Sequence, residues 1–307
     1  PPLPKDEIAE AIAFLEWLNA DNFVFLGLRE YHVDLSENAE ARIEKRDETG
    51  LGVLADPSVR ILRRGREFVS MTPEIRDFMM KAEALIVTKA NVKSKIHRRA
   101  YMDCIGIKRY TEDGRLVGEI RVAGLFSATA YTRSPREIPY LRRKVAEVMA
   151  RAGFDLQSHS GKALANILES YPRDELFQID TDLLHAFALA ILGLEERPRI
   201  RVLARPDRFD RFVSLLVFVP RDRYDSDVRV RIGDYFRSVY GGRVSAFYPA
   251  FPEGSLARVH FIIGRDEGVT PDVGQADLEA AVSRIVRTWA DDFDDLVLRA
   301  VRALAAD

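Results

Sequence analysis

The chain has 307 residues, of which 47% are hydrophobic and 31% are charged, which is the composition of a globular protein. Its formal net charge is −2, so no global electrostatic field favours binding to nucleic acid or to an anionic membrane. This length predicts two domains, each large enough for its own core, and the longest apolar runs, residues 186–192 and 213–219, are too short to span a bilayer. The single cysteine, Cys104, is expected to be a reduced, buried side chain in a cytoplasmic protein.

Both ends of the sequence suggest a piece of a longer polypeptide. The chain opens Pro1-Pro2-Leu3-Pro4 without an initiator methionine, and it stops at residue 307 inside a helical pattern that has no cap.

The first third of the chain predicts a mixture of helices and strands. Helices are expected at residues 7–19 and 73–82, strands at 23–35 and 84–88, and a charged loop at 36–46. A long hairpin then spans residues 101–131 and reverses at Glu112-Asp113-Gly114, because Asp-Gly accommodates the positive φ angles of a tight turn. The order predicts one curved antiparallel sheet with helices across one face, an α+β module.

The second arm of this hairpin predicts one buried and one partly buried face. Gly118, Ile120 and Gly124 alternate on the expected buried face, with Arg121 and Ala123 on the other. A glycine on a buried face indicates a bulge or the close approach of another group.

A helical stretch follows the hairpin. Helices are predicted from Pro139 to the residue before Gly153, at residues 161–169 and at residues 181–192. The polar segment 195–198 ends in a proline and predicts a domain boundary.

The last third has a regular β-β-α-β-β-α pattern. Strands are expected at residues 199–204, 212–219, 244–250 and 256–264, with helices at 227–240 and from about residue 277. Two consecutive ββα units over one four-stranded sheet predict a circularly permuted ferredoxin-like fold, whose second sheet face would be open to a partner or a small ligand.

Several short motifs match known functional patterns by residue type, but the residues around them do not provide the structural context that those functions need. The glycine pattern from Gly50 to Ala55 does not open a helix, so a dinucleotide site is not predicted. Gly161-Lys162 lacks the spacing of a phosphate loop, and Ser158-His159-Ser160 lacks an acid at a useful spacing. The five histidines are scattered, so no metal site is predicted, and His185 and His260 are expected to be hydrogen-bonded core residues.

Two charged segments remain as candidate binding sites. The basic residues between Lys89 and Arg99 are interpreted as a solvated or interdomain salt-bridged face, with anion or nucleic-acid binding as the alternative. The loop Pro220-Arg221-Asp222-Arg223 leads into a predicted helix, whose free N–H groups could bind the carboxylate of an amino-acid effector, and the loop around Arg205 is a second candidate. No catalytic residue is predicted anywhere in the chain.

Three stretches carry a resemblance to a known family. They are DNFVFLGLREYHV at 21–33, the residues 94–179, and the residues 197–249, and the sequences GLFSATAY at 124–131 and PRDELFQI at 172–179 are the most specific. In these residues the chain resembles the large bacterial NAD-dependent glutamate dehydrogenases, in the regulatory region that precedes their catalytic part.

The resemblance implies a PAS-like module at residues 1–135, a helical linker at 136–197, an ACT-like domain at 198–295, and the start of a helical region at 296–307. It implies a non-catalytic regulatory and assembly segment with no cofactor of its own, while NAD serves the parent enzyme. The expected partners are other domains of the same polypeptide, a second copy through the sheet surfaces, and an amino-acid effector. A scaffold-only role and an independent enzyme using residues 158–160 remain the alternatives.

Overall fold

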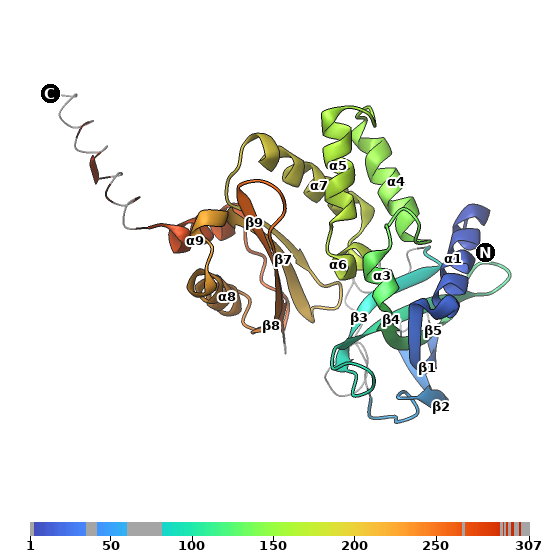
Figure 1. Ribbon diagram of the computed structural model, residues 1–307. Coiled ribbons are helices and arrows are strands. Elements are labelled where there is room, and N and C mark those ends of the chain that lie inside the picture. Colours follow the sequence, from blue (N-terminus) through green and yellow to red (C-terminus); the bar gives the residue numbers. More distant parts are fainter. Residues whose placement is uncertain are drawn as a thin grey trace. The chain divides into compact units, whose positions relative to one another are not determined.

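A computed structural model describes residues 3–34, 42–59, 82–265 and 268–288, together with residues 291, 293, 296, 297 and 301. The chain divides into two compact units, residues 1–192 and 193–307, each with its own antiparallel sheet (Figure 1).

The first unit is built on a five-stranded antiparallel sheet in the order β2-β1-β5-β4-β3. An N-terminal helix, α1 (Lys5–Trp17), and a π-helical turn (Leu18–Asn22) lead into its first strand. The strands are β1 (Phe23–Asp34), β2 (Arg42–Gly52), β3 (Leu85–Lys93), β4 (Tyr101–Tyr110) and β5 (Leu116–Phe126).

Strand β2 corrects the expectation of a loop at residues 36–46. Residues 42–46 belong to β2, which pairs with β1 at one edge of the sheet, while residues 36–41 lie outside the described part of the chain. The exposed residues 44–48 of this strand are all charged, and charged edge strands are common because they discourage pairing with another chain. The helix predicted at residues 73–82 also falls outside the described residues, except for Ala82.

The face of the central hairpin that was predicted to be buried is buried, including Leu116, Val122 and Phe126, but the face expected to be only partly buried is buried as well. A core cluster of Leu54, Ala90, Met102, Cys104, Ala123 and Leu125 lies on this second face. The glycines behave as expected: a Cβ on Gly118 would lie 2.6 Å from Tyr31 O, and one on Gly124 would collide with Val24 O and the ring of Phe23.

Within the described residues, five helices follow the sheet, and the last of them crosses the division between the units at residue 192. They are α3 (Ala128–Thr132), α4 (Leu141–Ala152), α5 (His159–Glu169), α6 (Arg173–Gln178) and α7 (Thr181–Glu196). Helix α4 ends at Gly153 in the left-handed conformation, as predicted. Helix α6 was not predicted, and its Phe177 stacks on Phe126 of β5 with ring centroids 4.4 Å apart.

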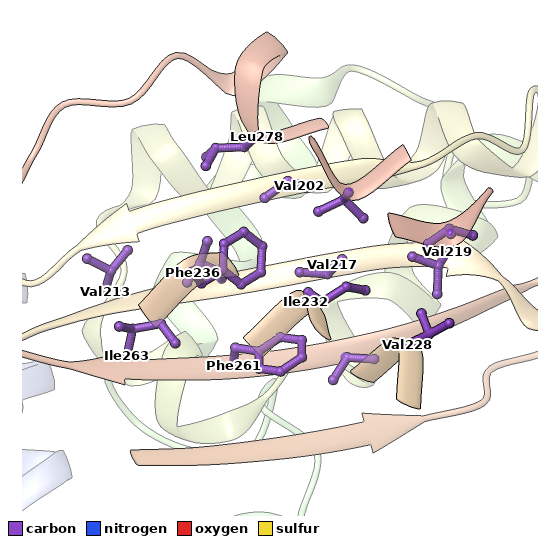
Figure 2. Close-up of a cluster of buried hydrophobic side chains, with 14 of the residues drawn as sticks. Val202, Val213, Val217, Val219, Val228, Ile232, Phe236, Phe261, Ile263 and Leu278 are labelled. Atoms are coloured by element: carbon purple, nitrogen blue, oxygen red, sulfur yellow. The ribbon is translucent and has the colours of Figure 1, made fainter. Parts of the chain in front are cut away.

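The second unit has the expected order of elements. Its strands are β6 (Arg201–Pro206), β7 (Phe212–Pro220), β8 (Arg243–Ala250) and β9 (Leu256–Gly264), arranged in the order β6-β7-β9-β8, and its helices are α8 (Ser226–Val239) and α9 (Gln275–Val286). Every adjacent pair of strands is antiparallel. Alternate residues of β7 and β9 pack with apolar residues of both helices in one core, in which Val217, Ile232, Phe236 and Phe261 lie together (Figure 2).

Candidate functional site

The predicted effector loop connects β7 to α8 in the second unit. Pro220 is the last residue of β7, and residues 221–223 form a single 3-10 turn. The backbone N–H of Arg221 donates to Ser255 O at 2.8 Å, which ties the turn to the start of β9. The Arg221 guanidinium lies 5.3 Å from the centroid of the Phe251 ring, and Tyr224 meets the same ring edge-on at 5.8 Å. Two aromatic rings and one guanidinium therefore gather beside the turn.

The start of α8 is already capped by its own chain. The carboxylate of Asp225 accepts a hydrogen bond from the N–H of Val228 at 2.7 Å. One of the helix N–H groups that we expected to be free for a ligand carboxylate therefore already has a partner. Asp222 and Asp227 add negative charge on either side of this cap. A carboxylate ligand here would therefore find one fewer free N–H group at the helix terminus than the sequence suggests.

Arg223 is also engaged within the chain. Its Nη1 and Nη2 donate to the two carboxylate oxygens of Asp291, each at 2.8 Å, in a bidentate ion pair. Thr288 donates to the same carboxylate, and this is the largest cause that lowers the pKa of Asp291 from its usual value.

Arg205 does not belong with this loop. Arg205 lies on β6 and pairs with Ser214 of β7. Ser214 is six residues before Pro220, so at the rise of a β-strand the two ends of this stretch are about 20 Å apart. The side chain of Arg205 is buried and its guanidinium lies 5.8 Å from the ring of Phe212. The two candidate arginine segments therefore lie at opposite ends of β7.

The first unit contains a buried charged network that the sequence did not predict. Lys89 Nζ on β3 lies 2.6 Å from Asp103 Oδ1 on β4 and 3.1 Å from Asp174 Oδ1 on α6. Tyr131 Oη on α3 donates to Asp174 Oδ1 at 2.8 Å. Arg98 Nη2 donates to Tyr131 Oη at 3.4 Å and to Phe126 O at 3.0 Å. Part of the basic segment from Lys89 to Arg99 is therefore an internal anchor between strands and helices.

Burial controls the protonation of this network. Desolvation, opposed mainly by the charge of Lys89, raises the pKa of Asp103 to about 6. The carboxylates of Asp103 and Asp174 overcome the desolvation of Lys89 and raise its pKa, while desolvation raises the pKa of Tyr131. The signal for the network in the sequence is slight, because its members are spread from residue 89 to residue 174.

The remaining motifs have structural roles. Arg29 is buried and donates to the carbonyl oxygens of Leu54, Asp56 (2.8 Å) and Val59 (3.3 Å), so the segment after Gly52 wraps around an arginine. Ser158 is the N-cap of α5 and its Oγ accepts from Gly161 N at 3.0 Å. Cys104 is a buried thiol, as predicted.

The two histidines of interest differ. His260 is buried and its Nε2 lies 2.8 Å from Ser214 Oγ, which confirms the prediction of a hydrogen-bonded core residue. His185 on α7 is half-buried, and its Nε2 has no hydrogen-bond partner within the described residues. In the same part of the chain, no three side chains of the His, Cys, Asp or Glu type are grouped to hold a metal, and no helix has the length and apolar character to cross a bilayer.

Comparison with known proteins finds one family model that matches the helical region and a second that matches the C-terminal region. Residues 138–197 match the family model of glutamate dehydrogenase helical motif 1, and residues 201–290 match that of the glutamate dehydrogenase ACT2 domain. Proteins described as NAD-specific glutamate dehydrogenase are similar to nearly the whole chain: one from Halomonas elongata is 40% identical over 92% of the chain, one from Pseudomonas aeruginosa 37% over 96%, and one from Mycobacterium tuberculosis 32% over 90%.

These relatives are much longer than the chain. The matches cover 17%, 18% and 16% of their lengths, so the chain spans about a sixth of each. These matches confirm the resemblance to NAD-dependent glutamate dehydrogenases that the sequence carries.

Proposed function

We propose that the chain is a non-catalytic regulatory and assembly segment of a cytoplasmic NAD-dependent glutamate dehydrogenase. The parent reaction would convert L-glutamate, NAD and water to 2-oxoglutarate, ammonia and NADH, with NAD bound by another part of the polypeptide. The observation that carries the proposal is the match of residues 201–290 to the ACT2 domain, over a stretch that folds as one four-stranded sheet with two helices.

Both units are assigned finer folds within this proposal. The strand order β6-β7-β9-β8, with a helix after each pair of strands, supports a permuted ferredoxin-like, ACT-like domain. The five-stranded antiparallel order β2-β1-β5-β4-β3 supports a PAS-like module in the first unit. Residues 138–192 of the helical motif 1 match lie in the same compact unit as that module.

An amino acid is the proposed effector, and the turn at Pro220, Arg221, Asp222 and Arg223 is its proposed site. A guanidinium can bind a carboxylate through two parallel hydrogen bonds, which makes arginine suited to this recognition. Arg221 and Arg223 supply two such groups, and the rings of Phe251 and Tyr224 supply an apolar wall beside Arg221. Arg205 is left out of the proposed site because it lies at the other end of β7.

Assembly through a sheet edge is the second part of the proposal. Strand β8 is an edge strand of its sheet, and the side chains of Val244, Phe247 and Tyr248 on it are exposed. Unpaired backbone groups along such an edge favour addition of another strand, and we propose a second copy of the chain as the partner. These exposed side chains also favour the alternative, a scaffold that assembles the parent enzyme and binds no effector.

Two measurements test the proposal. Glutamate-dependent NADH formation should be absent for the purified chain, and activity of this piece alone would establish an enzyme in its own right. Sedimentation should show a concentration-dependent dimer that Phe247→Lys weakens and that Leu156→Lys, at an exposed position of the first unit, leaves unchanged. A strict monomer at all concentrations would refute the assembly role.

A further inference from the structure

One carboxylate joins the proposed effector turn to the helix that begins after α9. Asp291 receives the bidentate pair from Arg223, with both N–O distances at 2.8 Å. Its Oδ2 also accepts from Thr288 N at 2.8 Å and from Thr288 Oγ1 at 2.9 Å, while Asp291 N lies 3.4 Å from Thr288 Oγ1. This reciprocal pattern is a capping box, in which the cap residue and the residue three positions later satisfy each other's backbone N–H groups.

The bidentate geometry of the Arg223–Asp291 pair is also the geometry in which Arg223 would bind the α-carboxylate of a free amino acid. A planar guanidinium binds any carboxylate through the same two parallel N–H···O bonds, whether the carboxylate belongs to a side chain or to a small molecule. The side chains of Arg223 and Asp291 are 37% and 25% exposed, so water and solutes reach the pair. Ion pairs at this depth are weak enough to exchange with a competing ligand.

We propose that Arg223 is a carboxylate-binding residue whose site Asp291 fills, so that a ligand carboxylate and Asp291 exclude each other. The inference rests on the proposed sensing function and adds its mechanism of transmission. A carboxylate that binds Arg223, with its remaining atoms against Phe251 and Arg221, would displace Asp291 and take the Arg223 contact away from the capping box. The start of the following helix would then be held by Thr288 alone.

This arrangement would convert ligand binding into a change at the end of the ACT2 domain. Residues 291, 293, 296, 297 and 301 are helical, and the Arg223 pair fixes the first of them to the β7–α8 turn. Loss of the pair should loosen the first turn of this helix, because the two hydrogen bonds from Arg223 are what hold Asp291 to the β7–α8 turn.

The test uses L-glutamate as the probe, with calorimetry for affinity and hydrogen exchange for the amides of residues 288–301. If Asp291 competes, Asp291→Asn should bind glutamate about two- to fivefold more tightly than the wild-type chain. Saturating glutamate should speed exchange at residues 288–301 of the wild type, and Arg223→Lys should weaken binding about tenfold. Asp234→Asn is the matched control, because Asp234 forms a comparable surface pair with Arg237 on α8.

The outcomes separate this inference from the function on which it rests. Equal affinity of the wild type and Asp291→Asn, with unchanged exchange at residues 288–301, would overturn the competition and leave amino-acid sensing in place. Absence of glutamate binding by both proteins would overturn the carboxylate site at Arg223, and the response to the other amino acids would then decide the proposed function separately.

Discussion

Tyr131 donates a hydrogen bond from its hydroxyl to Asp174 Oδ1 at 2.8 Å, and Lys89 Nζ lies 3.1 Å from the same oxygen. Residue 131 ends the stretch GLFSATAY and residue 174 lies near the start of PRDELFQI, so the two most specific stretches of the sequence meet at one carboxylate. Through this oxygen, helical motif 1 is bonded to the sheet of the first unit.

Removal of Lys89 should destabilise the first unit strongly. Lys89→Met would leave Asp103 buried without its cation, and breaking one partner of a buried ion pair costs about 3–5 kcal/mol. Urea denaturation of the whole chain measures the loss. Lys95→Met, at an exposed position of the β3–β4 loop, should change the free energy of unfolding by less than about 0.5 kcal/mol. Equal effects of the two substitutions would contradict the anchor.

The stability of the first unit should depend on pH through Asp103. Burial raises the pKa of this carboxyl to about 6 in the folded chain, above its ordinary value near 4. Between these two values the folded chain holds a proton that the unfolded chain has released, so the contribution of Asp103 is present below pH of about 4 and is lost as pH rises through about 6. The denaturation midpoint, compared with that of Asp103→Asn across this window, checks the sign. Parallel pH profiles for the two proteins would show that Asp103 does not titrate there.

Glycine is required at residue 124 by the close approach of strand β1. Gly124→Ala would push a Cβ into Val24 O and the ring of Phe23, and strain of this kind in a packed core costs about 1–3 kcal/mol. Gly193→Ala is the control, because no atom lies within 4 Å of a Cβ added at that position of α7. Alanine in a helix stabilises by about 0.5–1 kcal/mol over glycine, so thermal denaturation should move in opposite directions for the two variants. A shift of the same sign for both would refute this account.

Glu10 should anchor the N-terminal helix to α4. Its Oε1 accepts from Tyr140 N and Arg142 Nε at 2.8 Å, and its Oε2 accepts from Arg142 Nη2 at 2.6 Å. The Arg142 hydrogen bonds are the largest cause that lowers the pKa of Glu10, so its contribution is present above pH of about 4.5 and is lost as pH falls through its lowered folded pKa. Glu10→Gln should destabilise the chain by about 1 kcal/mol at neutral pH. Asp182→Asn, which alters a more exposed pair with Arg151, should have a smaller effect in the same denaturation assay.

Periodicity predicted those elements whose side chains face one core. The order of the second unit follows from strands such as β7, whose alternate residues pack against both helices. In the first unit, the end of α4 follows from Gly153. Strand β2 escaped prediction because its charged residues lie at a sheet edge, and α6 because its six residues are shorter than two turns.

The candidate sites were harder to predict than the elements. Arg223 was found from its place before a helix, but its pairing with Asp291 joins residues that are 68 positions apart. The same holds for Lys89, Asp103 and Asp174, whose types alone suggest surface charges. Local pattern shows which residues lie on a turn or a strand, whereas only the packing of distant elements decides which charges are buried together.

Isothermal titration of the chain with the twenty standard amino acids tests the central claim, a sensing role for the ACT2 domain, most directly. We predict saturable heat with at least one amino acid, weakened about tenfold or more by Arg221→Ala and unchanged by Arg237→Ala on the same unit. The absence of heat with every amino acid would contradict the sensing role and leave the assembly role alone.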